Sequence, residues 1–135
     1  VTMTIERIKL KVLDRFPGIG SWAPLRRWKD RKVLLGYRIK INGTICYVFL
    51  GQDGLGKQVN GQQTNIPLYC EIALAEGGKI AEKLGSTGEV VFRLLPQYKR
   101  KDSYYRFAPF GADELEAAGQ KLLDVLSLIL PDPVR

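Results

Sequence analysis

The chain has 135 residues, 45% of them hydrophobic and 26% charged, so it is long enough to bury the core of one globular domain. Its formal net charge of +7 favours a negatively charged partner, and the absence of histidine excludes Ser-His-Asp and Cys-His catalysis and most transition-metal sites. The two cysteines, Cys46 and Cys70, are too few for a structural zinc site, and we expect two buried thiols rather than a disulfide.

No apolar stretch approaches the roughly 20 residues that span a bilayer, and the N-terminus lacks the pattern of a signal peptide. We therefore expect a cytoplasmic protein that does not bind a membrane. Residues 1–135 contain no internal repeat or linker, which predicts a single α+β domain. Val1 in place of methionine leaves open that this domain is excised from a larger protein.

The first predicted element is a helix over residues 4–16. Ile5, Ile8, Val12 and Phe16 have helical spacing, although part of this stretch also alternates as in a strand. The length of the stretch and the Pro-Gly pair that follows it favour the helix. Residues 17–32 contain further prolines and glycines and are predicted to form a loop.

A β-hairpin is predicted next, because two β-rich runs are joined by Asn42-Gly43. A two-residue turn there sorts the side chains onto two faces of the hairpin. The face expected to pack on the core carries Tyr37, Ile39, Ile41, Thr44, Cys46 and Val48. The opposite face carries Arg38, Lys40, Ile45, Tyr47 and Phe49, which predicts a mixed cationic and aromatic surface.

Residues 51–65 are predicted to form a long polar loop. Gly51, Gly56 and Lys57 match a nucleotide-binding P-loop, but Gln58 replaces the Ser or Thr that binds Mg²⁺, and no helix follows. The strand before the loop also belongs to an antiparallel hairpin rather than to a parallel sheet. We therefore expect an amide-rich loop in which Lys57 contacts an anion, and not a nucleotide cradle.

The second half of the chain predicts strands and a long helix. Residues 66–75 suggest a strand and residues 75–85 a short helix, followed by a strand pair at 89–95 and 103–110 around a basic connection. Asp113 and Glu116 resemble a capping box at the start of a C-terminal helix with a wide apolar face. The predicted fold is an antiparallel sheet of four or five strands, with the Asn42-Gly43 hairpin at its centre, packed against N- and C-terminal helices.

Basic residues that alternate with aromatic residues recur three times along the chain, and this pattern predicts a non-catalytic domain that binds nucleic acid or another polyanion. Cations neutralise phosphates, and aromatic rings stack on exposed bases. The sequence does not distinguish DNA from RNA. The candidate binding residues are Arg26, Arg27, Trp28, Lys29, Arg38, Lys40, Tyr47, Lys57, Tyr98, Lys99, Arg100, Lys101, Tyr104 and Arg106.

Two alternatives remain open at this stage. A protein-protein adaptor or accessory subunit would use the C-terminal helix, with a homodimer as one form of it. A metal-dependent, nuclease-like enzyme would have to bring together Asp53, Glu71 and Lys79, whose spacing is not distinctive. We assign no catalytic residue, no metal ligand and no cofactor. The basic and aromatic residues can also be explained as solvated surface and as anchors of loops.

Overall fold

A computed structural model of the chain describes residues 4–22, 27–28, 31–53, 58–59, 62–63, 67–86, 97–101, 103–111 and 113–130. The helices are α1 (Ile5–Arg15), α2 (Ile80–Leu84) and α4 (Leu115–Ile129). The strands are β1 (Ser21–Trp22), β2 (Arg27–Trp28), β3 (Arg31–Ile41), β4 (Thr44–Asp53), β5 (Gln58–Val59), β6 (Gln62–Gln63), β7 (Leu68–Leu74), β8 (Gln97–Lys101) and β9 (Tyr104–Phe110).

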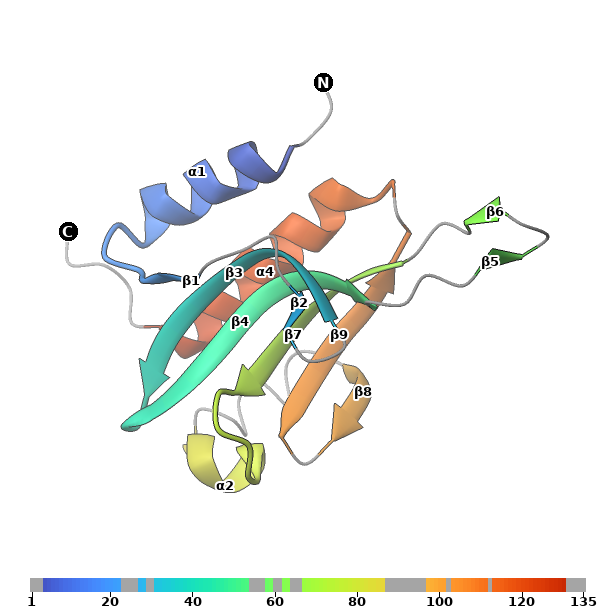
Figure 1. Cartoon of the computed structure of the whole chain (residues 1–135). Helices are drawn as coiled ribbons and strands as arrows, with labels where there is room; N and C mark the ends of the chain where they lie inside the picture. The colour runs from blue at the N-terminus through green and yellow to red at the C-terminus, as the bar shows by residue number, and fades with distance from the viewer. Residues whose placement is uncertain are drawn as a thin grey trace.

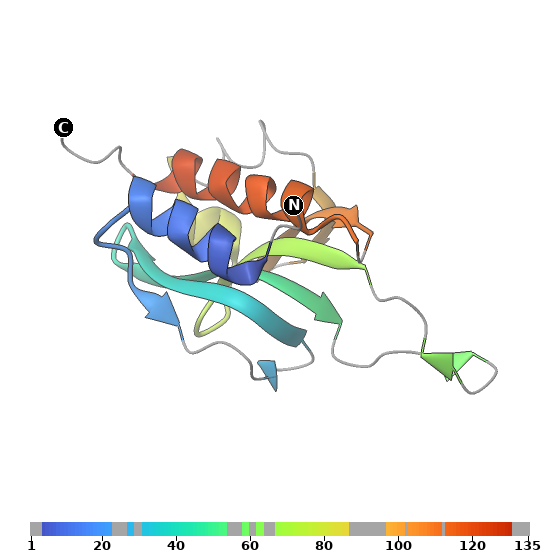
Figure 2. The ribbon, with the colours of Figure 1, turned by 90° about the horizontal axis from the view of Figure 1, so that it is seen from above.

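One antiparallel sheet in the order β1-β3-β4-β7-β9-β8 organises the protein, and the short β2 also pairs with β3 (Figure 1). Helices α1 and α4 lie side by side on the same face of this sheet (Figure 2). The predicted α+β fold is therefore confirmed. No helix in the described part of the chain is long and apolar enough to cross a membrane.

The β3–β4 hairpin has the predicted register. Ile41 pairs with Thr44, and the pairing continues regularly to Gly36 and Phe49. Asn42 and Gly43 have φ values of 50° and 78°, the two positive angles of the turn that suits the twist of a tight hairpin. Asn42 also donates from Nδ2 to the carbonyl oxygen of Leu84 at 2.8 Å, so the turn is tied to the end of α2.

The main core lies between the sheet and the two long helices. Strand residues such as Tyr37, Ile72 and Phe107 are buried in this core together with the apolar residues of α1 and α4. A flank of α4 packs against α1, where Gly119 lies directly against Ile8. The wide apolar face of the C-terminal helix is thus covered on two sides within one chain.

Three segments that the sequence predicts as loops or connections contain strands. The predicted loop over 17–32 contains β1, β2 and the first residues of β3, and the predicted loop over 51–65 contains the end of β4 and the small β5–β6 ladder. The basic connection between the last strands is itself a strand, β8, which pairs with β9. Charged residues, lysines above all, are common on edge strands because they discourage pairing with other chains. The predicted strand over 89–95 lies outside the described residues.

The ends of the long helices are stabilised differently. Thr4 caps α1, because its hydroxyl oxygen accepts from the backbone N–H of Arg7 at 3.2 Å. The predicted capping box of Asp113 and Glu116 is wrong, because Glu114 occupies the N-cap position of α4 and makes no side-chain capping bond. The Glu114 carboxylate instead accepts from the N–H of Gly111 at 2.7 Å, so it closes the turn before the helix.

The contact between α1 and α4 generates a test of the packing. A Cβ atom at Gly119 would lie 2.7 Å from Ile8 Cδ1, closer than carbon atoms pack. We expect Gly119→Ala to lower the free energy of unfolding by about 1–2 kcal/mol in the wild-type chain, because overpacking outweighs the gain in helix propensity. In an Ile8→Ala background the same substitution should raise it by about 0.5–1 kcal/mol.

Urea denaturation of the four proteins in this cycle measures both effects. Gly18→Ala serves as a control, since nothing lies within 4 Å of a Cβ atom at Gly18. A Gly119→Ala effect of the same sign in both backgrounds would contradict the packing of α1 on α4.

Candidate functional site

The sheet face that points away from α1 and α4 carries a row of side chains across four strands. Arg38 on β3 pairs with Tyr47 on β4, Tyr47 pairs with Ala73 on β7, and Ala73 pairs with Tyr104 on β9. Arg38 is exposed and both tyrosines are half-buried, whereas Ala73 is buried between them. Lys40, also exposed, lies two residue pairs closer to the hairpin turn. We call Arg38, Lys40, Tyr47 and Tyr104 the open face.

A small residue on the intervening strand separates the two tyrosines of the open face. The strand between them contributes only the methyl group of Ala73 at this position. Adjacent strands are about 4.8 Å apart, which separates the backbones of β4 and β9 by roughly 10 Å. The two tyrosines therefore lie in one row, two strands apart, and Arg38 lies at one end of that row.

Phe49, which the sequence places on the mixed surface, is fully buried instead. It belongs to a second, smaller cluster with Val33, Tyr69 and Ala73 on the face opposite the helices. The rings of Phe49 and Tyr69 meet edge to face with their centroids 6.3 Å apart. The prediction of an exposed Phe49 is wrong because alternation along a strand assigns a face but does not say whether that face is covered.

An ion-paired triad lies beside this second cluster. Glu71, in the middle of β7, has no exposed surface, and its carboxylate lies between Arg31 and Arg106. Arg31 Nε is 2.7 Å from Glu71 Oε2, and Arg106 Nε donates to Glu71 Oε1 at 2.9 Å. We call these three residues the buried triad.

Aromatic rings complete the surroundings of the buried triad. The guanidinium carbon of Arg106 lies 3.8 Å from the centroid of the Tyr69 ring, and that of Arg31 lies 4.5 Å from the centroid of the Tyr104 ring. Such stacking is favourable for a planar guanidinium that has lost much of its water. Tyr104 thus contacts the buried triad on one side and belongs to the open face on the other.

The charge state of Glu71 follows from two opposing causes. Burial raises the pKa of the Glu71 carboxyl to about 6, and the two neighbouring guanidiniums oppose this rise. The carboxyl group is therefore ionised at neutral pH and carries the negative charge that both arginines need. Since the chain has no histidine, this carboxyl is the group expected to titrate closest to neutrality among those with a resolved shift.

Two predictions about charged residues change with the buried triad. Arg106 is only 3% exposed and is held by Glu71, so it does not contribute to a phosphate-binding surface as the sequence predicts. The metal-dependent alternative also loses Glu71, whose carboxylate is enclosed by arginines. Lys79 is exposed at the start of α2, and the side chain of Asp53 is outside the described part. No group of three or more acidic or sulfur ligands suited to a metal occurs among the described residues.

The remaining predicted binding residues fall on edge strands or outside the described ranges. Tyr98, Lys99, Arg100 and Lys101 all belong to β8, whose backbone register sets Lys101 opposite Tyr104. Arg27 and Trp28 form β2 at the other edge of the sheet. The structure therefore brings Arg38, Lys40, Tyr47 and Tyr104 onto one face with β8 as its border. The predicted residues that lie outside the described ranges are Arg26, Lys29 and Lys57.

Sequence reasoning missed the buried triad, although one signal for it was present. Glu71 interrupts an otherwise apolar strand that is buried on both faces, and a buried carboxylate needs a charged partner. Which arginines pair with it depends on strand order, because Arg31 and Arg106 are distant from it in sequence.

Both cysteine thiols are free and buried, as predicted. Burial raises the pKa of the Cys46 thiol to about 11 and also raises the pKa of Cys70, where the charge of Glu71 adds to the effect. Neither thiol is therefore a nucleophile at neutral pH.

Comparison of the chain with protein-family models, curated proteins and solved structures found no match.

The buried triad generates a test of stability. We expect Arg106→Leu to lower the free energy of unfolding by about 3–5 kcal/mol at a pH near 8, because Glu71 then keeps one guanidinium in place of two. Arg38→Leu, an exposed arginine on the same face, should change it by no more than about 0.5 kcal/mol. Urea denaturation of both variants compares the two effects.

The same variant should show a characteristic pH dependence. Losing Arg106 raises the pKa of Glu71 further above about 6, so the folded variant takes up a proton at a higher pH than the folded wild type. The loss of stability should be largest above the raised pKa of the variant, should shrink as the pH falls from there to about 6, and should change little below that. A loss that is constant between pH 8 and pH 5 would contradict an ionised Glu71 in the triad.

Proposed function

We propose that the protein is a non-catalytic domain that binds single-stranded nucleic acid on the open face. The observation that carries this proposal is the row of cross-strand neighbours that runs from Arg38 through Tyr47 and Ala73 to Tyr104. The row combines a cation with two partly exposed aromatic rings on the face of an antiparallel sheet whose other face is covered by helices. Sheets of this kind offer a flat platform for unstacked bases.

The chemistry of each position supports this assignment. The two tyrosine rings offer a surface on which bases stack, and stacking on one aromatic side chain is worth about 1–3 kcal/mol per base. Arg38 is the cross-strand partner of Tyr47, Lys40 lies on the same strand as Arg38, and both supply charge for phosphates. The side chain of Ala73 is small and projects little from the sheet between the two tyrosines, so a nucleotide can cross from one ring to the other.

Charge around the open face is also consistent with a polyanionic ligand. Strand β8, which pairs with β9, contains Lys99, Arg100 and Lys101. The net charge of the whole chain is +7, and residues 1–50 contain eleven lysines and arginines against three acidic residues. The resulting field favours association with nucleic acid of any sequence and gives it a strong dependence on salt.

The adaptor alternative has less support from the same geometry. It predicts an exposed apolar surface on the C-terminal helix, whereas Leu122, Val125 and Leu126 of α4 are fully buried within the chain. A dimer formed by this helix stays a prediction without a structural observation in its favour. Single-stranded nucleic acid is thus the partner that the open face fits best.

Binding of a fluorescent single-stranded oligonucleotide tests the proposal. We expect the wild-type protein to bind at low salt and to lose affinity steeply as salt is added. The double variant Arg38→Glu/Lys40→Glu should bind at least about tenfold more weakly, with a salt slope smaller by about 1–2. Lys9→Glu/Lys11→Glu on the exposed side of α1 makes the same change in net charge on the other side of the molecule and should retain most of the affinity.

Removal of an aromatic ring separates stacking from charge. Tyr47→Leu keeps an apolar side chain against Ala73 and should weaken single-stranded binding by about 1–3 kcal/mol while leaving duplex binding nearly unchanged. Absence of binding at low salt, or an equal loss in the α1 control, would refute the proposal.

A further inference from the structure

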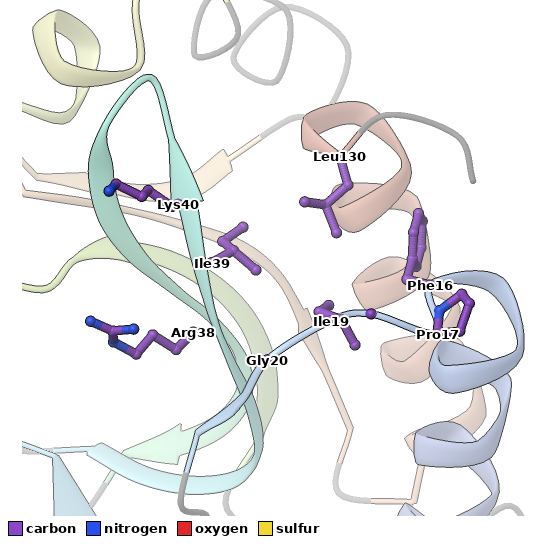
Figure 3. A pocket seen from close by; sticks show the side chains of 9 residues that line it. Phe16, Pro17, Ile19, Gly20, Arg38, Ile39, Lys40 and Leu130 are labelled. Carbon is purple, nitrogen blue, oxygen red and sulfur yellow. The ribbon is translucent and has the colours of Figure 1, made fainter. Parts of the chain in front are cut away.

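A pocket of about 450 Å³ lies at the edge of the sheet beside β3 (Figure 3). The chain that leaves α1 forms one wall, from Phe16 to Gly20, and the end of α4 contributes Leu130. Strand β3 forms the other wall from Arg38 to Lys40. Pockets of this volume with mostly apolar walls are typical binding sites in proteins.

The side chains in Figure 3 divide into two groups. Ile39, Ile19 and Leu130 point toward one another across the pocket, whereas Arg38 and Lys40 extend away from it on the other side of β3. The contribution of Arg38 and Lys40 to the pocket is therefore mainly their backbone. The pocket thus combines an apolar interior with the main-chain edge of a strand.

This strand edge is only partly occupied. The carbonyl oxygen of Gly20 accepts from the N–H of Arg38 at 3.0 Å, and β1 pairs with β3 from there toward Gly36. Peptide groups alternate in direction along a strand, so the N–H and C=O of Lys40 point to the same edge as those of Arg38. Within the described ranges, no strand pairs with β3 at Lys40 on this side.

From this geometry we infer that the edge pocket binds an extended peptide of a partner protein by strand addition. The peptide pairs with the main chain of β3 at Lys40 and inserts one apolar side chain between Ile19, Ile39 and Leu130. Main-chain hydrogen bonds and a side-chain pocket are the two components of this mode of recognition. The inference does not rest on nucleic-acid binding, because the peptide pairs with the main-chain edge of β3, and the two sites share only the charges of Arg38 and Lys40.

Charges near the edge pocket indicate the chemistry of the peptide. Arg38 and Lys40 are exposed on β3, and Arg15 is exposed at the end of α1, with its guanidinium 5.7 Å from the centroid of the Phe16 ring. The acidic residue nearest in sequence to these three cations is Asp14, which directly precedes Arg15. The fitting segment therefore has a large apolar residue flanked by acidic residues, which electrostatic complementarity favours over a neutral or basic one.

A library of fluorescein-labelled heptapeptides tests the inference. Its members hold Leu, Ile, Phe or Met at the centre, Asp or Glu at both ends, and all residues at the other positions. We expect binders to be found by fluorescence polarisation, and the tightest one to shift the backbone amide signal of Lys40 in the NMR spectrum and to protect it from exchange. N-methylation of the peptide's alternate amides should abolish this binding, because it removes the donors that a strand needs.

Gly18→Phe is the variant that isolates the pocket. Gly18 lines the pocket and a Cβ atom there meets no atom within 4 Å, so we expect the ring to be accommodated and to fill part of the pocket. We expect this variant to remain folded and to lose roughly tenfold to a hundredfold in peptide affinity, the cost of excluding one apolar side chain. Ala117→Phe on the exposed side of α4 is the matched control and should bind as the wild type does.

Several results would overturn the inference. They are the absence of any binder at millimolar peptide, NMR shifts remote from Lys40, or equal affinity of Gly18→Phe and the control. Retained binding of the N-methylated peptide would show that the pocket takes an apolar group without strand pairing. Dimerisation in sedimentation that Gly18→Phe abolishes would show that a second copy of the chain occupies the edge.

Discussion

The register of the β3–β4 hairpin determines the rest of the structure. Asn42 and Gly43 both adopt positive φ angles, and this turn fixes which residues of the two strands face each other. A slip by one residue would move every side chain of a strand to the other face of the sheet. The main core under the helices, the open face and the edge at Lys40 all depend on this one register. The bond from Asn42 to Leu84 adds a tertiary contact that holds the turn in place.

The buried triad divides the face opposite the helices into two parts. Near the triad, Glu71, Arg31 and Arg106 are buried with Phe49 and the Tyr69 ring, and that part of the face is closed to ligands. Toward the hairpin turn, the next row is open and presents tyrosines and cations. Tyr104 joins the two parts, because its ring stacks on Arg31 and also borders Ala73. The triad therefore orients one of the two rings on which the proposed function depends.

Much of the fold could be predicted from the sequence where local signals were sufficient. The Asn-Gly turn gave the pairing of Ile41 with Thr44, and helical spacing gave α1. Predictions failed where the outcome depended on contacts distant in sequence. Alternation placed Phe49 on the correct face, but only the neighbouring strands decide that this position is covered. Arg106 looked like one more surface cation because nothing near it in sequence indicates its bond to Glu71.

Strand β3 serves three purposes through three different groups of atoms. Tyr37, Ile39 and Ile41 point into the main core, whereas Arg38 and Lys40 direct their side chains toward the open face. The peptide groups of Arg38 and Lys40 point sideways, toward β1 and the edge pocket. The two proposed sites therefore share a strand without sharing the same atoms, apart from the charges of Arg38 and Lys40. An acidic peptide at the edge would neutralise part of that charge, so peptide binding and nucleic-acid binding are expected to weaken each other.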